Sequence, residues 1–263
     1  MKIAFVGKGG SGKTTLAGTL ARVLARRQHR LLAIDGDPNP NLSLMLGMSR
    51  ADADRIRSIP PSLIESVTTP AGQSTLRLTM ARHRVLDEYA AQAPDGVQLI
   101  VMGKPADGSA GSGCMCGSHR AVRGLIAEMT GAGEHTVTDM EAGLEHLKRG
   151  TARHVEAMLI VAEPYYRSLE AASRTFSLAN ELKIPHVYAV ANKVRDDADR
   201  EAIESYCRQH GMPVIGVVPL EERFVAAERA GEAPADYADG SAGLRAIEAL
   251  ADRLLALEAR QAA

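Results

Sequence analysis

The feature that most constrains this 263-residue chain is a glycine-rich segment between an apolar run and a run with helical spacing. Residues 7–15 read Gly-Lys-Gly-Gly-Ser-Gly-Lys-Thr-Thr and match the pattern G-x-x-x-x-G-K-[ST]. Glycines let successive backbone N–H groups converge on phosphate oxygens, and the N-terminus of the helix that follows adds partial positive charge. The segment predicts a loop that binds nucleotide phosphates through Gly9, Gly10, Ser11, Gly12, Lys13, Thr14 and Thr15. We expect Lys13 to reach the β- and γ-phosphates and the Thr14 hydroxyl to coordinate Mg²⁺.

The rest of the chain alternates short apolar runs with longer segments of helical spacing, which predicts a mostly parallel sheet with helices on both faces. Strands are expected at residues 2–6, 30–35, 97–102, 135–139, 157–162, 186–191 and 213–218. The clearest helices are expected at residues 13–27, 165–182, 198–210 and 242–260. Residues 49–73 lack sustained periodicity and are interpreted as an insertion or mobile segment. The fold prediction is a single doubly wound α/β domain over residues 1–263, with about seven or eight strands.

Composition excludes several classes of protein. Hydrophobic residues make up 45% of the chain, too many for a disordered protein. A net charge of -1 and an aromatic content of 3% argue against a nucleic-acid partner. No apolar run approaches the ~18 residues of a membrane span, and the charges of residues 242–260 are too mixed for a membrane-surface helix. Three cysteines without a signal peptide predict a cytoplasmic protein.

The phosphate loop carries a second lysine, Lys8, directly after its first glycine. With this K-G-G-x-G-K-[ST] loop the chain resembles the deviant Walker A ATPases, which include division-site and plasmid-partition ATPases, the nitrogenase iron protein and metal-centre maturation ATPases. In that family two subunits face each other across sandwiched nucleotides, and the early lysine touches the partner's phosphates. The resemblance implies an ATP-dependent homodimer in which Lys8 acts in catalysis together with Lys13 and Asp37. A cation supplied by the partner would couple hydrolysis to association.

Two further segments resemble the family's switches. Residues 35–41 follow the second strand and contain Asp37-Pro38, which resembles the first switch, where an aspartate orients the attacking water. Residues 139–146 resemble the second switch, D-x-x-A-G. The resemblance implies that Asp139 holds Mg²⁺ through water and that Gly143 lets the backbone follow the γ-phosphate.

The base of the nucleotide is expected near the end of a late strand, where doubly wound folds bind ligands. Asn192 resembles the family's purine-contacting asparagine. Guanine-specific proteins place an aspartate two residues after the lysine of this motif, whereas Arg195 stands there, and a donor-only side chain cannot accept the guanine protons. ATP is therefore the predicted nucleotide, and Pro219 is expected to close the other side of the base.

A pair of cysteines, Cys114 and Cys116, lies in a segment rich in Gly and Ser. Thiolates bind soft or borderline metals such as Ni²⁺ or Zn²⁺, but a tetrahedral site needs four ligands, so a two-fold dimer would have to supply two from each chain. A redox dithiol and two inert cysteines are the alternatives. Cys207 is expected to pack in a helix, and His119 is left unassigned.

The combination of motifs resembles the CooC-type accessory ATPases that mature nickel carbon monoxide dehydrogenase. That resemblance implies a metallochaperone that dimerises with ATP and assists nickel insertion into this client enzyme. One alternative is an ATP-dependent Fe–S reductase like the nitrogenase iron protein, although residues 139–150 lack the cysteine of its second loop. The other is a positioning or partition ATPase, which would need a membrane-targeting helix or a basic DNA-binding surface.

Overall fold

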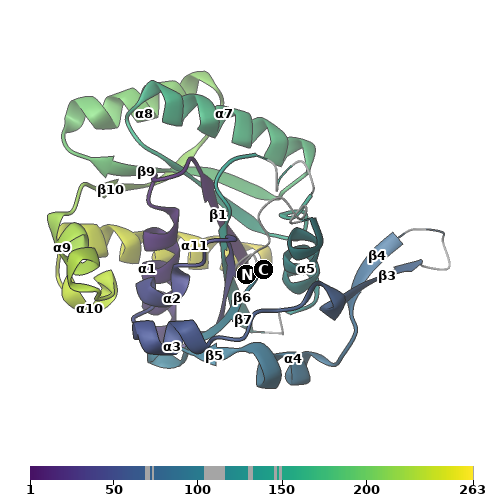
Figure 1. Cartoon of the computed structure of the whole chain (residues 1–263). Helices are drawn as coiled ribbons and strands as arrows, with labels where there is room; N and C mark the ends of the chain where they lie inside the picture. Colours follow the sequence, from purple (N-terminus) through teal and green to yellow (C-terminus); the bar gives the residue numbers. More distant parts are fainter. Residues whose placement is uncertain are drawn as a thin grey trace, which may run out of the picture.

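An eight-stranded sheet runs through the centre of the protein in the computed structural model, which describes residues 1–68, 72, 74–103, 116–129, 133–144, 147 and 150–262 (Figure 1). Its strands lie in the spatial order β10 (Val214–Pro219), β9 (His186–Val194), β8 (Ala157–Ala162), β1 (Lys2–Gly7), β7 (Glu134–Met140), β2 (Arg30–Gly36), β6 (Gln98–Val101) and β5 (Ala91–Gln92). Neighbouring strands are parallel except β5, which runs antiparallel to β6. The predicted α/β class and mostly parallel sheet are confirmed.

Helices cover both faces of this sheet. One face packs against α1 (Lys13–Arg26) and α11 (Ala242–Ala262), and the other packs against α4 (Arg82–Tyr89), α5 (Cys116–Glu128), α7 (Tyr166–Glu181) and α8 (Asp197–Gln209). Side chains of β1 alternate between the two cores, because successive residues of a strand point to opposite faces. Ile3 and Phe5 join the α1 side, whereas Ala4 and Val6 join the other.

The C-terminal helix α11 belongs to the core. Leu244, Ile247, Leu250 and Leu254 are each no more than 3% exposed, which confirms that this apolar stripe docks on the sheet. No helix among the described residues combines the length and apolar character that crossing a bilayer would take.

Residues 49–73 contain regular structure that their sequence pattern does not predict. They hold α3 (Arg50–Arg55), the 3₁₀ turn η1 (Pro61–Leu63) and β3 (Ile64–Thr68), and β3 pairs with β4 (Ser74–Leu78) in a separate antiparallel hairpin. Ile64 anchors the hairpin against α5 at Gly124, where a Cβ would lie 2.5 Å from the Ile64 Cδ1. The stretch interpreted as an insertion or mobile segment thus contains regular elements in its described residues. Leu76 and Leu78 of β4 also pack against the buried core, so apolar side chains from both strands hold the hairpin to the domain.

The remaining short elements connect the larger ones. These are α2 (Leu42–Met45), η2 (Pro94–Gly96), α9 (Glu222–Ala230) and α10 (Pro234–Tyr237).

Candidate nucleotide site

Six adjacent strands deliver the predicted site residues to one edge of the sheet. The parallel strands β10, β9, β8, β1, β7 and β2 end on the same side, so the segments that follow them lie together. In strand order, the carboxyl ends of these strands or the residues directly after them carry Pro219, Asn192, Glu163, the phosphate loop, Asp139 and Asp37, of which Glu163 was not predicted. The register pairs Gly7 with Val161 and Asp35 with Asp139.

The phosphate loop folds tightly between β1 and α1. The Ser11 N–H donates to the Lys8 carbonyl at 3.2 Å, and Gly12, at the N-cap of α1, has a φ of 96°. A Cβ at Gly12 would lie 2.4 Å from Nδ2 of Asn192, so the close approach of β9 requires glycine here. The side chain of Lys8 is exposed, whereas Ser11 is buried.

Lys13 occupies the centre of this arrangement. Its side chain comes from the first residue of α1, is 7% exposed, and places Nζ 3.2 Å from the Lys8 carbonyl oxygen, to which it donates. Burial lowers the pKa of the Lys13 ammonium, while the carboxylates of Asp139, Asp37 and Glu163 act in the opposite direction. Lys13 is thus a buried cation near three acids, and a phosphate bound beside it would gain from its charge.

Asp35 and Asp139 form a buried pair of carboxyl groups on neighbouring strands. Burial raises the pKa of Asp139 to about 8, and the charge of Asp35 adds to that effect, whereas a hydrogen bond with the Thr14 hydroxyl lowers it. Burial likewise raises the pKa of Asp35 to about 6, although hydrogen bonds from backbone N–H groups act to lower it. Two acids this close and this buried favour a bound cation.

Unsatisfied oxygens show that the residues present fit Mg²⁺. Oδ1 of Asp139 and the hydroxyls of Thr138 and Ser11 are buried without a hydrogen-bond partner among the described residues. A hard divalent cation takes oxygen ligands of this kind, often with retained waters, and would keep the carboxylates ionised. Thr14 and Asp139, which share a hydrogen bond, would be the residues to hold it.

Asp35 is a site residue that sequence reasoning missed. Its Oδ2 accepts from the Leu42 N–H at 2.9 Å and its Oδ1 from the Asp37 N–H at 3.2 Å, so this buried carboxyl group shapes the loop that carries Asp37. Asp37 is half-buried, accepts from the Asn39 N–H at 2.8 Å, and lies close enough to influence Lys13. The available signal was an acid at the end of a buried strand, two residues before the predicted switch aspartate.

The two residues predicted at the base come together in one pocket. Asn192 and Pro219 line it with Gly12, Thr15, Leu16, Leu220 and Phe224. Nδ2 of Asn192 also donates to the Ser11 carbonyl at 2.7 Å, so the same side chain contacts the phosphate loop and faces the pocket. Leu16, Pro219, Leu220 and Phe224 give the pocket apolar surfaces that suit a flat heteroaromatic ring, beside the Asn192 amide and three charged side chains, Lys193, Glu221 and Glu228.

The second-switch segment also reaches the loop. Gly143 has a φ of 98°, and the neighbouring Ala142 Cβ lies 3.7 Å from the position that a Cβ on Gly9 would take. Cys114 lies outside the described residues, and Cys116 is the first residue of α5. Within the described part of the chain, no group of three or more His, Cys, Asp or Glu side chains could hold a metal ion. The predicted cysteine site, which would draw on Cys114, is thus untested.

A glycine-rich loop between β1 and α1, at the carboxyl edge of a doubly wound sheet, defines a P-loop nucleotide-binding protein. The family model described as "CobQ/CobB/MinD/ParA nucleotide binding domain" matches residues 3–235, and the chain belongs to this family.

Relatives and solved structures agree with that assignment. The chain is 36% identical over 240 residues to the carbon monoxide dehydrogenase accessory protein CooC of Rhodospirillum rubrum, with 88% of each chain covered. It is 31% identical over 258 residues to an uncharacterised ATP-binding protein of Methanocaldococcus jannaschii, with 97% of this chain and 98% of that one covered. The septum site-determining protein MinD of Pyrococcus horikoshii, solved with Mg-ADP, superposes with a TM-score of 0.74 at 21% identity, covering 98% of this chain and 96% of that one. This last likeness shows the fold.

Proposed function

We propose that this protein is an ATPase that dimerises with ATP and assists nickel insertion into a carbon monoxide dehydrogenase. The observation that carries the proposal is the similarity to the accessory protein CooC along 88% of both chains, in a sequence that also holds Cys114-Met115-Cys116. Membership of the family accounts for nucleotide binding. Hydrolysis, dimerisation and the metal cargo are proposed in addition.

Hydrolysis would use residues that lie at the carboxyl ends of the parallel strands. Lys13 binds the β- and γ-phosphates, and Thr14 and Asp139 would hold Mg²⁺, which would supply further positive charge beside the phosphates. Asp37 accepts a hydrogen bond from the attacking water and orients it. The exposed Lys8 extends to the phosphates bound by the partner subunit, so the site is complete only in the dimer.

The same dimer would assemble the metal site. Two cysteines from each chain supply the four thiolates that a tetrahedral site requires, and Ni²⁺ is the cargo that they hold and release. ATP binding and metal binding then stabilise one interface, and each ligand raises the affinity for the other.

The test is a measurement of metal and molar mass on the same sample. Full-length Asp37→Asn protein is purified without oxygen, mixed with ATP and Mg²⁺, and then given Ni²⁺ or Zn²⁺. The expected result is a dimer with about one metal ion, which is lost in Cys114→Ser and Cys116→Ser variants. Cys207→Ala is the matched control, since Cys207 is buried in α8 and should not affect the metal content.

Other outcomes would contradict the proposal in identifiable ways. Nucleotide-dependent dimers without bound metal would overturn the metallochaperone role and leave a nucleotide switch. A brown protein with iron and sulfide would favour the Fe–S reductase, and ATP-dependent pelleting with liposomes or DNA would favour a positioning ATPase.

A further inference from the structure

Lys193 adopts a backbone conformation that residues with a side chain rarely take. It follows Asn192 near the end of β9 and has a φ of 58°. This geometry accompanies an ammonium group that points back at the phosphate loop, where Nζ donates to the Gly10 carbonyl at 2.6 Å. A strained residue that contacts a binding loop is a reason to look for a role there.

Consecutive residues of β9 therefore hold consecutive carbonyls of the loop. Asn192 holds the Ser11 carbonyl at 2.7 Å, and Lys193 holds the Gly10 carbonyl. Because a trans peptide is planar, fixing a carbonyl on one side directs the next N–H to the other side. These contacts keep the loop in a fixed conformation before any anion arrives, which lowers the entropic cost of binding.

The ammonium of Lys193 has a second partner, Glu163. Nζ donates to Oε1 of Glu163 at 2.9 Å, and the side chain of this acid is 10% exposed. Glu163 follows β8, and its own N–H donates to the Ser168 hydroxyl at 3.0 Å, which fixes it at the start of α7. Glu163 is thus held at its backbone by Ser168 and at its carboxylate by Lys193.

A carboxylate at this position would oppose the binding of a polyphosphate. Glu163 is close enough to Lys13 for its charge to act on that ammonium, so it is also close to where the phosphates bind. Its charge is neutralised by Lys193, which is itself 39% exposed and tied to the loop. Without Lys193, a nearly buried negative charge would face the bound nucleotide with no compensating cation.

We infer that Lys193 and Glu163 are positioning residues that set nucleotide affinity, with Lys193 fastening the phosphate loop and neutralising Glu163. The inference rests on the nucleotide-binding part of the proposed function and is independent of the metal cargo.

The test is calorimetric titration of the full-length protein with Mg-ADP and with a non-hydrolysable ATP analogue. Lys193→Met should weaken binding about tenfold or more, since it removes a charged hydrogen bond and leaves Glu163 unpaired. Adding Glu163→Gln to Lys193→Met should restore most of the affinity, to within about threefold of the wild type, and Lys193→Arg should retain it. At saturating ATP the turnover of Lys193→Met should stay within about threefold, so that KM changes more than kcat.

Lys183→Met is the matched control. Lys183 is an exposed lysine with the same φ of 58°, at the end of α7, so this variant removes an equal charge from an equally strained backbone. It should bind nucleotide as the wild type does. Equal affinity in Lys193→Met and wild type, or no recovery in the double variant, would overturn the inference. Wild-type protein that binds no nucleotide would contradict the proposed function as well, whereas absence of nickel alone would leave this inference standing.

Discussion

His135 is a buried imidazole at the start of β7, at the edge of the sheet opposite the nucleotide site. Its Nε2 lies 3.1 Å from Nδ1 of His29 and 3.7 Å from a carboxylate oxygen of Glu258. Burial lowers the pKa of His135 to about 4; the α-amino group of Met1 and His29 lower it further, against Glu258 and Glu156. The native state therefore holds this ring neutral, while the unfolded chain takes up a proton near pH 6.5.

Acid should destabilise the protein through this residue. The pKa of His135 is lower in the native state than in the unfolded state, so stability is complete above about pH 6.5 and falls as the pH drops toward 4. The free energy of unfolding should decrease by on the order of 1 kcal/mol between pH 7 and pH 5 on account of His135 alone. Urea titrations across this range should show a shallower pH dependence in His135→Gln than in the wild type.

His83→Gln is the control for that experiment. His83 is exposed on α4, and its removal should leave the pH profile of the wild type in place. A His135→Gln profile as steep as that of the wild type would show that other groups cause the acid destabilisation.

Residues whose positions follow from local chain geometry could be predicted from the sequence, and those whose contacts depend on strand adjacency could not. Lys13 and Thr14 have a fixed place in a loop between a strand and a helix, so the pattern alone assigned them and the structure brings them to one edge. The contacts of Lys193 with Gly10 and Glu163 depend on the order of the strands, in which β9 lies beside β8 and β8 lies beside β1, and the sequence does not reveal that order.

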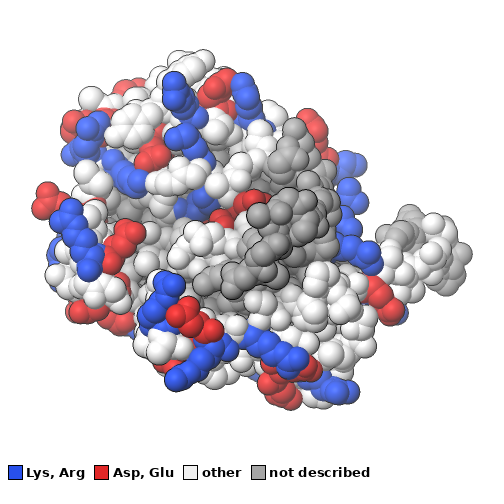
Figure 2. All heavy atoms as spheres, in the orientation of Figure 1, with Lys and Arg blue, Asp and Glu red and all other residues white. Residues whose placement is uncertain are grey.

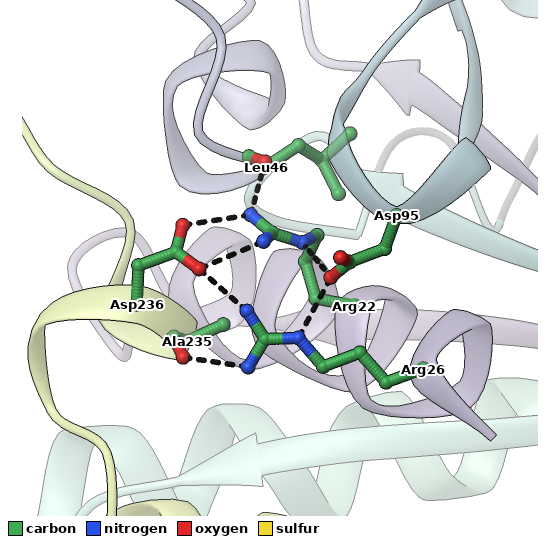
Figure 3. A network of polar contacts seen from close by, with 6 residues as sticks. All are labelled: Arg22, Arg26, Leu46, Asp95, Ala235 and Asp236. Atoms are coloured by element: carbon green, nitrogen blue, oxygen red, sulfur yellow. Dashed lines mark hydrogen bonds and ion pairs between the residues drawn. The ribbon is translucent and has the colours of Figure 1, made fainter.

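At the scale of elements, one guanidinium connects four segments of the fold (Figure 3). Arg22 of α1 has a side chain only 3% exposed and donates to Asp95 of η2, to Asp236 of α10 and to the Leu46 carbonyl that follows α2. Arg26, one turn further along α1, reaches the same two carboxylates. The network fastens the helix that begins at the phosphate loop to the turn that follows the Asp37 loop.

Arg22→Met should destabilise the protein by about 2 kcal/mol. Removing the cation of a buried ion pair typically costs about 3–5 kcal/mol, and the loss is smaller here because Arg26 remains and both carboxylates are partly exposed. Arg27→Met is the matched control at the C-cap of the same helix, since Arg27 pairs at the surface with Asp252, and its loss should cost less than about 1 kcal/mol. Thermal or urea unfolding compares them, and equal losses would contradict a special role for the network.

The elements themselves show which patterns could be recognised in the sequence. The β1, β2, β7 and β8 ranges were predicted to within two residues. For β1, β2 and β8 the reason is that strands buried on both faces read as nearly continuous apolar runs, whereas β7 is mostly polar in sequence although it is buried. The hairpin β3–β4 was missed because β3 exposes most of its residues, with a buried anchor at Ile64. The end of β9 was also missed, since Asn192 and Lys193 are polar residues that extend the strand toward the nucleotide edge.

At the scale of the whole molecule, the surface suggests which edge meets a partner. On the face shown in Figure 2, acidic and basic side chains lie intermixed, in keeping with a net charge of -1. Among the described residues, four of the five exposed large hydrophobic side chains come after the ends of β8 and β10. Tyr165 is 54% exposed, Tyr166 72%, Leu220 45% and Val225 41%, and the strands they follow have their carboxyl ends at the nucleotide edge of the sheet. Exposed apolar groups of this kind mark interaction sites more often than a mixed charged surface does.

If the dimer forms across this edge, replacing Tyr165 and Tyr166 together with serine should weaken it about tenfold or more, because buried aromatics dominate interface energies. The monomer should remain folded, since Tyr165 is the N-cap of α7 and makes no capping hydrogen bond, whereas serine is a favoured N-cap.

Tyr237→Ser is the control; Tyr237 is 37% exposed on α10, beside Asp236 of the Arg22 network at the far end of α1. Sedimentation of Asp37→Asn protein with ATP and Mg²⁺ gives the dimer dissociation constant for each variant. Equal constants for the double variant and for Tyr237→Ser would place the interface elsewhere, whereas a selective loss would join the nucleotide site and the dimer at one edge of the sheet.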